Sequence, residues 1–176
     1  MKFLKKTTLF LLVLFALIIF FLPKTALYYQ LEHMLSEEKI ILSGEITRDS
    51  GFLFSIDDGT LYYDDLEVVQ LKGITITPLI AFNRISFTPF TFSKDIQNFL
   101  PGTIEQMKIQ YTFVDPLHII FNAQGEFGTL NGSIAFLEKL LHASLLPSDM
   151  LLKKRPIWLK EFKKQEGGIY QYESNY

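Results

Sequence analysis

The chain has 176 residues, a formal net charge of −2 and no cysteine. This length accommodates one domain of about 100–200 residues, and the balanced charge excludes the strongly basic surface typical of nucleic-acid-binding proteins. Without cysteine there is no disulfide framework, thiolate zinc site or cysteine nucleophile. Hydrophobic residues make up 48% of the chain and aromatic residues 15%, which favours a folded protein rich in β-strands.

Residues 1–23 are predicted to form an uncleaved transmembrane signal-anchor. Lys2, Lys5 and Lys6 precede an uninterrupted apolar run from Leu9 to Leu22. A cleaved signal peptide shares the basic start, but it ends at a small-x-small site, whereas this run ends in bulky side chains. The pattern therefore favours the anchor over the cleaved form.

The apolar segment is short for a membrane span. Thr7–Leu22 gives a helix of about 24 Å, against a hydrocarbon core of about 30 Å. We expect a kinked continuation past Pro23 to meet the shortfall, with Lys24 snorkelling towards solvent. Because positive charge stays on the cytoplasmic side, the N-terminus is expected inside and the rest of the chain outside, which in a bacterium means an inner-membrane protein with a periplasmic domain.

Residues 24–38 are predicted to be an amphipathic linker helix. Leu27, Leu31, Met34 and Leu35 recur at helical spacing. We expect this apolar stripe to cover one end of the sheet that follows. The alternative is an interface with a helix of a partner.

Residues 39–176 are predicted to form an antiparallel β domain with a C-terminal helical segment. From residue 39 the apolar period is two, which is typical of antiparallel strands with one buried face. The helical segment begins near Pro147 and resumes at Pro156. The expected strands are Ile40–Ile46, Phe52–Asp57, Thr60–Asp64, Leu66–Leu71, Gly73–Thr77, Arg84–Phe92, Ile104–Val114, Leu117–Ala123, Gly128–Phe136, Lys139–Leu146 and Ile169–Glu173.

Glycine, proline and acidic residues mark the expected turns. Asp57-Asp58-Gly59 lies between two alternating runs and predicts a β-hairpin, because the primed turn needs the positive φ that Gly accepts. Further turns are expected near Asn131-Gly132 and Glu138-Lys139. Pro89 cannot donate to a ladder, so its strand is expected at an edge or a bulge.

The apolar face of a single sheet must be covered, and the segments expected to cover it are the linker helix and the C-terminal helical segment. Their combined area is smaller than that of the apolar strand face. The fold class is therefore mainly β with flanking helices: a transmembrane helix followed by a curved antiparallel sheet, half-barrel or groove-like in shape. The candidate groove residues are Phe52, Phe54, Phe87, Ile109, Tyr111 and Phe121.

No residue pattern points to catalysis, a cofactor or a metal. His33, His118 and His142 are far apart and have no second ligand at metal-binding spacing. The carboxylates of residues 57–67 do not match the EF-hand spacing and are interpreted as a solvated turn rather than a calcium site. Neither a nucleophile elbow nor a phosphate-binding glycine loop occurs, so an enzyme is not expected.

A basic stretch follows the last long strand. It is interpreted either as a solvated helix face or as a contact for lipid headgroups or an acidic partner. Near an anionic membrane surface each basic residue contributes about 1 kcal/mol. Its members are Lys153, Lys154, Arg155, Lys160, Lys163 and Lys164.

The order of these features carries a family resemblance. The segments concerned are Leu22-Pro23, Ile41–Gly44, Gly51–Tyr62, Val68–Leu79, Gly128–Ser133, Leu146-Pro147 and Gly167–Tyr170. With them the chain resembles the type II secretion system protein N family, also called general secretory pathway protein N, and the wider AsmA-like group. The resemblance implies an inner-membrane protein with a groove-like periplasmic sheet and no catalytic residues.

Two functions follow as hypotheses. The leading one is a structural or interaction component of a type II secretion-like envelope assembly, with the proteins of that complex as partners. The alternative is an AsmA-like lipid-handling module that binds acyl chains in the apolar groove.

Overall fold

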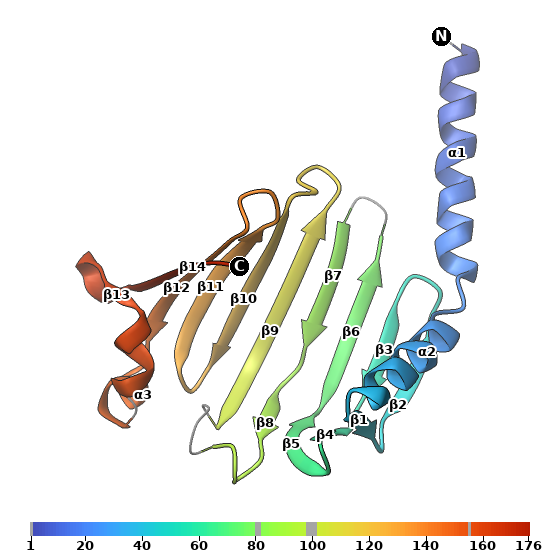
Figure 1. The fold of residues 1–176 in the computed structure, drawn as a ribbon. Helices are drawn as coiled ribbons and strands as arrows, with labels where there is room; N and C mark the ends of the chain where they lie inside the picture. The colour runs from blue at the N-terminus through green and yellow to red at the C-terminus, as the bar shows by residue number, and fades with distance from the viewer. Residues whose placement is uncertain (1, 80–81, 98–101, 155) are drawn as a thin grey trace.

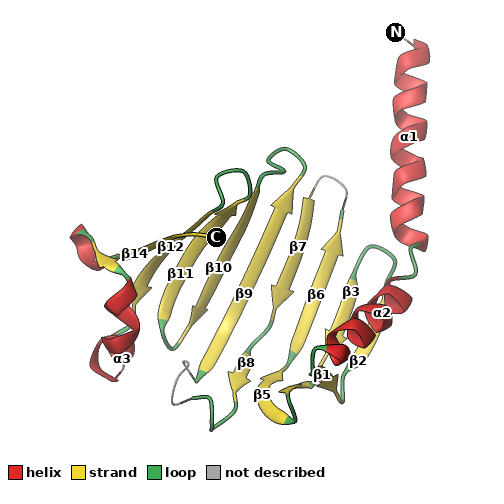
Figure 2. Ribbon diagram, in the orientation of Figure 1, coloured by secondary structure: helices red, strands yellow, loops and turns green. Residues whose placement is uncertain are grey.

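A computed structural model describes residues 2–79, 82–97, 102–154 and 156–176 of the chain. It is mainly antiparallel β-sheet, and the sheet is not closed. Figures 1 and 2 show one long N-terminal helix standing off the sheet and shorter helices at its two ends. The helices are α1 (Lys2–Phe21), α2 (Lys24–Glu37) and α3 (Asp149–Lys154), with the 3₁₀ turns η1 (Pro156–Glu161) and η2 (Glu166–Gly168).

All the strands of the described residues belong to one sheet. They are β1 (Ile40–Ser43), β2 (Ile46–Asp49), β3 (Phe54–Asp57), β4 (Thr60–Tyr63), β5 (Leu66–Leu71), β6 (Gly73–Pro78), β7 (Phe82–Phe87), β8 (Phe90–Phe92), β9 (Thr103–Thr112), β10 (His118–Gly125), β11 (Gly128–Ala135), β12 (Leu140–Pro147), β13 (Lys163–Lys164) and β14 (Tyr170–Asn175).

Helix α1 has the length and composition of a membrane span. Its segment Phe3–Phe21 has a mean hydropathy of 2.2, and none of it is buried against the rest of the chain. Twenty helical residues extend about 30 Å, which matches the hydrocarbon core. The first turn and a half of this helix carries Lys2, Lys5 and Lys6, so the apolar part is shorter than the helix. The chain is helical again directly after Pro23, where α2 begins at Lys24.

The expectation that Lys24 reaches solvent is wrong. Its side chain is 5% exposed, and its ammonium lies 3.2 Å from the carboxylate of Asp49 at the end of β2. The same ammonium donates to the carbonyl of Leu22. A buried cation needs a paired anion, and this pair joins the start of α2 to the sheet.

The long strand β9 is where the sheet divides. Its Met107–Thr112 half pairs with β7, and its Thr103–Ile104 end pairs with β8. One arm therefore runs β7–β6–β3–β2 and the other β8–β5–β4–β1, while β10, β11, β12 and β14 continue the sheet on the far side of β9. Pro89 lies at the break between β7 and β8, as its missing donor predicts.

The predicted hairpin at Asp57–Gly59 is wrong. Strand β3 pairs with β2 and β6, whereas β4 pairs with β1 and β5, so the chain crosses from one arm to the other at this turn. Asp58 and Gly59 do have the expected positive φ, at 57° and 127°. The amide of Asp58 donates to the carbonyl of Lys72, and the carbonyl of Gly59 accepts the amide of Leu71, both at the connection between β5 and β6. Pairing with distant strands therefore overrides the local preference for a hairpin.

Two other local predictions meet the same competition. The run Ile40–Ile46 is split at Gly44, whose φ is 81°, into β1 and β2 on different arms. Asn131 and Gly132 lie in the middle of β11, paired on both sides, and the turn falls at Glu126-Phe127 instead. The turn at Glu138-Lys139 is confirmed.

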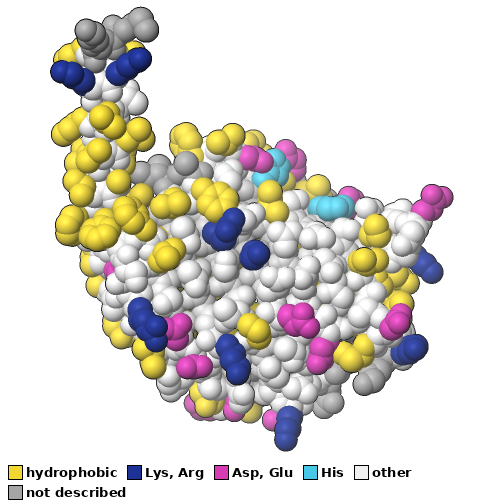
Figure 3. Space-filling view, turned by 180° about the vertical axis from the view of Figure 1, so that it is seen from behind, with side chains coloured by type: hydrophobic (Ala, Val, Ile, Leu, Met, Phe, Trp, Pro, Cys, Tyr) yellow, Lys and Arg dark blue, Asp and Glu magenta, His cyan; other side chains and the backbone are white. Residues whose placement is uncertain are grey.

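The register separates the sheet into two chemically different faces. Residues paired directly across antiparallel strands share a face. One face, here called the apolar face, carries Ile and Phe, and the outer face carries Thr, Gln, Asn, Lys and Arg. The apolar face presents Phe54, Ile56, Ile74, Ile76, Ile85, Phe87, Met107, Ile109, Tyr111, Ile119, Phe121, Ala123, Leu130, Ile134, Leu141, Ala143 and Leu145. Figure 3 shows the outer face, where charged side chains are scattered and separate groups of hydrophobic side chains lie between them.

Helices cover the apolar face only at its two ends. At one end Leu151 of α3 and Leu159 of η1 pack with Ala123, Phe127 and Leu145 in a buried cluster. At the other end α2 contacts β1 and β2, next to the buried side chains of the two arms. Between them no described helix lies over the strands (Figure 1).

Candidate functional site

Five of the six predicted groove residues share the apolar face. A row of directly paired positions joins Phe54, Ile76, Ile85, Ile109 and Phe121 across five strands. Phe87 lies on the same face two residues after Ile85, and Tyr111 lies there two residues after Ile109. The exception is Phe52, which precedes β3 in a loop and is 41% exposed.

The middle of the apolar face forms the candidate site. Ile85, Ile109, Tyr111 and Phe121 are each only half-buried, by their neighbours on the sheet. By contrast Phe54, at the α2 end, is 3% exposed under the ring of Tyr28. The site is thus a strip of aliphatic and aromatic side chains that the chain's own helices leave accessible.

Two hollows lie at the α2 end of this strip. One, of about 310 Å³, lies between α2 and the two arms, with Leu35, Val69 and Phe90 in its lining. The other, of about 230 Å³, is lined by Leu22 next to the end of α1 and by Phe54 and Ile76 of the sheet. The second hollow therefore connects the foot of the anchor with the apolar face.

Two ionisable groups border the first hollow. The hydroxyl of Tyr28 donates to the carboxylate of Glu45 at 3.0 Å, and burial together with this bond raises the pKa of Tyr28. Burial and the nearby Glu45 carboxylate raise the pKa of Glu32. Each change favours the neutral form of the group concerned.

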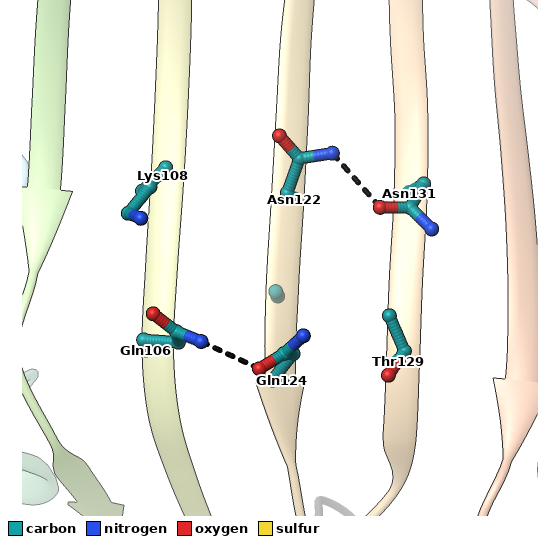
Figure 4. Close-up of a pocket in the computed structure, with 7 residues that line it drawn as sticks. Gln106, Lys108, Asn122, Gln124, Thr129 and Asn131 are labelled. Carbon is teal, nitrogen blue, oxygen red and sulfur yellow. Dashed lines mark hydrogen bonds between the residues drawn. The ribbon is translucent and has the colours of Figure 1, made fainter.

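The outer face has a shallow polar depression, shown in Figure 4. Amide side chains pair across the strands there: Asn122 donates to Asn131 at 2.8 Å, and Gln106 donates to Gln124. Lys108 lies beside them as the lone cation of the lining. These exposed amides form hydrogen bonds with one another across the strands and make this part of the outer face polar.

The structure places the described members of the basic stretch on α3, η1 and β13, at the end of the sheet away from α1. Helix α3 follows the end of β12 that points away from α1, and β13 lies beside the start of β14 (Figure 1). The side chains of Lys153, Lys160, Lys163 and Lys164 are exposed. Lys154 ends α3, and the prediction for Arg155 lies outside the described residues.

The histidines lie at the surface of the sheet or of α2. His118 and Asp115 form a pair at 2.7 Å, and His142 and Glu173 form one at 3.2 Å. The carboxylate of Asp115 raises the pKa of His118 through this hydrogen bond. Among the described residues no three His, Cys, Asp or Glu side chains gather as metal ligands.

Sequence reasoning missed two parts of the site. Ile76 and Ile85 extend the row between Phe54 and Ile109, and their alternation within β6 and β7 was the available signal. The Lys24–Asp49 pair, which fixes α2 over the end of the face, has no sequence signal because the partners are 25 residues apart.

The fold and the site together define a protein with one apolar N-terminal helix and an open antiparallel sheet that keeps an accessible apolar face. No protein-family model, characterised protein or solved structure matches the chain. A function must therefore be inferred from the geometry of the chain itself.

Proposed function

We propose that this is a single-pass protein of the bacterial inner membrane that binds lipid acyl chains on the apolar face of its periplasmic sheet. Helix α1 is the anchor, with its N-terminus in the cytoplasm. The role is one of binding rather than catalysis. The observation that carries the proposal is the accessible strip around Ile85, Ile109 and Phe121 between the two helix-covered ends.

The chemistry of this strip suits a hydrocarbon ligand. An acyl chain needs no hydrogen-bond partner, and each methylene removed from water contributes about 0.8 kcal/mol. Ten methylenes laid along the strip would therefore gain roughly 8 kcal/mol before the ordering costs of binding are subtracted.

The foot of the anchor provides a route for the ligand. The hollow lined by Leu22, Phe54 and Ile76 begins where α1 ends and opens towards the row of paired apolar residues. A lipid leaving the bilayer beside α1 meets apolar side chains first at this point.

Photo-crosslinking tests the proposal. The full chain is reconstituted in vesicles that contain a phospholipid with a diazirine in its acyl chain, and the adducts are mapped by mass spectrometry. We expect adducts on Ile85, Ile109 and Phe121 of the apolar face. The matched controls are Lys108 and Gln110, the neighbours of Ile109 on the outer face. Adducts confined to α1 would contradict lipid binding by the sheet.

A second candidate function, a structural component of a type II secretion-like assembly, is supported by a free strand edge. Strand β13 pairs only with Tyr170 and Gln171 of β14, and no other described strand pairs on that side of Tyr172–Asn175. Unpaired edges can accept a strand from another protein. Co-purification of secretion-system proteins from detergent-solubilised membranes would support this role, and recovery of a lone monomer under mild conditions would oppose it.

A further inference from the structure

We propose that the loops at one end of the sheet insert into the outer surface of the same bilayer that α1 crosses. This inference rests on the membrane anchoring in the proposed function. The loops form an apolar rim, defined here by Leu79, Phe113, Val114, Phe136 and Leu137. They would hold the sheet upright beside the anchor, with the end of the apolar face in the outer leaflet.

The rim is a structural unit rather than a set of separate tips. Leu79 follows β6, Phe113 and Val114 join β9 to β10, and Phe136 and Leu137 join β11 to β12. Antiparallel pairing brings these connections to the same end of the sheet. The amide of Phe136 donates to the carbonyl of Leu117 at 2.9 Å, which joins the last two loops directly.

Exposure is what sets the rim apart. Val114 is 90% exposed, Phe113 and Leu137 are each 71% exposed, and Phe136 is 46% exposed. A group of neighbouring loops with apolar side chains this exposed is typical of a surface that contacts a membrane or another protein.

The opposite end of the long strands has a different composition. The described parts of its connections contain Lys72, Thr88, Glu126 and Ser148, and the ring of Phe127 among them is 6% exposed. No large side chain in the described part of these connections is both apolar and exposed. In the described connections, the strongly exposed apolar side chains therefore belong to the rim and not to the opposite end of the long strands.

Helix α1 leaves the sheet on the side of the rim. Figure 1 shows α1 rising past the same end of the sheet at which the β9–β10 and β11–β12 loops project. The ring of Phe20, near the foot of α1, packs on that of Phe52 in the β2–β3 loop with centroids 5.4 Å apart. Together with the Lys24–Asp49 pair, this contact sets the direction of the anchor relative to the sheet.

The chemistry of the rim indicates insertion driven by apolar contact. Its neighbouring charged side chains are Asp115, Glu138 and Lys139, which give no excess of positive charge. Binding should therefore not require anionic lipid, in contrast to contacts made by a basic stretch. Each Phe or Leu side chain transferred fully from water into an apolar environment favours the inserted state about tenfold or more.

Single-cysteine labelling of the full chain tests the inference, because the natural chain has no cysteine. The variants Val114→Cys and Leu137→Cys carry an environment-sensitive fluorophore in phosphatidylcholine vesicles, where doxyl-labelled phosphatidylcholine is the quencher. The matched control is Leu146→Cys, an exposed leucine of the outer face at the other end of β12, 53% exposed. Val13→Cys, in the middle of α1, reports whether the anchor itself is inserted.

We expect the labels at positions 114 and 137 to be quenched at least threefold more strongly than the label at 146, equally with and without anionic lipid. Quenching at position 13 but equal, weak quenching at 114, 137 and 146 would overturn the rim and leave the anchor intact. Absence of quenching at position 13 would overturn the membrane anchoring of the proposed function, and the rim with it.

Discussion

The Lys24–Asp49 pair makes a quantitative prediction about the joint between anchor and sheet. In the Asp49→Asn variant the amide oxygen can still accept the Gly51 amide, which lies 3.0 Å from the carboxylate, so the change chiefly removes the charge. A pair 3.2 Å apart has a Coulomb energy of roughly 5 kcal/mol at an effective dielectric of about 20, before desolvation is counted.

The net effect is smaller than this Coulomb energy. Loss of one partner of a fully buried pair costs about 3–5 kcal/mol, and Asp49 is 26% exposed, so we expect about 2–3 kcal/mol. That corresponds to a melting temperature lower by roughly 5–10 °C for a chain of this size. Thermal unfolding of the full chain in a nonionic detergent, followed by circular dichroism, measures the change.

The matched control is Asp64→Asn, which breaks the exposed Lys39–Asp64 pair of 2.6 Å. Exposed pairs contribute about 0–1 kcal/mol, and Asn tolerates the positive φ of Asp64. Equal melting temperatures for the two variants would refute the view that Lys24 depends on its partner.

The same pair predicts a pH dependence. Burial raises the pKa of Asp49, but hydrogen bonds from Gly51 and Lys24 and the charge of Lys24 outweigh it, so the pKa lies below its ordinary value. A carboxylate with a lowered folded-state pKa stabilises the fold above its unfolded-state pKa, near 4. This contribution should disappear as the pH falls from about 4 through the lowered value. An acid-side stability profile unchanged in the Asp49→Asn variant would contradict this assignment.

Three further predictions concern other parts of the fold. Gly132→Ala should destabilise the protein by about 1–3 kcal/mol in the same melting assay, because the added Cβ would meet the ring of Phe121 and the backbone of β12. The control Ser133→Ala, on the outer face, should have little effect. Ser148→Ala should lower the free energy of unfolding by about 1 kcal/mol, because the Ser148 hydroxyl accepts a hydrogen bond from the Leu151 amide at 3.1 Å at the start of α3. A variant as stable as the natural chain would show that this cap is dispensable. The hydrogen bond to Asp115 raises the pKa of His118. The stabilisation from this pair is therefore present below about pH 6.5 and is lost as the pH rises through the raised pKa. NMR titration should show a lower His118 pKa in the Asp115→Asn variant, and an unchanged His118 pKa would exclude the pairing.

Local patterns predicted the faces of the strands well. The alternation of Met107, Ile109 and Tyr111 with Gln106, Lys108 and Gln110 recurs in β9 as its apolar and outer faces. Period two follows from strand geometry alone, so it needs no knowledge of the partner strand.

Pairing between strands was predicted less well. The Asp57–Gly59 turn has the backbone conformation that its residues favour, but the strands on either side find partners in different arms. Asn131-Gly132 resembles a turn locally, yet Gly132 is required beneath the ring of Phe121. Both cases depend on contacts distant in sequence, which a local pattern does not contain.

The candidate site was predicted only in part for the same reason. Phe54 and Phe121 share a face because of the registers of the four strand pairs β3–β6, β6–β7, β7–β9 and β9–β10 that lie between them. The sequence of a single segment does not determine these registers. Phe52 alternates with Leu53 as a strand residue would, but it lies in the loop against Phe20 of α1.

Native mass spectrometry of the full chain, released from mild detergent after extraction from its own membrane, tests most directly whether the accessible apolar face holds lipid. We predict that phospholipid stays bound, and that Ile109→Asn releases it while Gln110→Asn, its outer-face neighbour, retains it. A natural chain that emerges free of lipid, with both variants indistinguishable from it, would contradict the account.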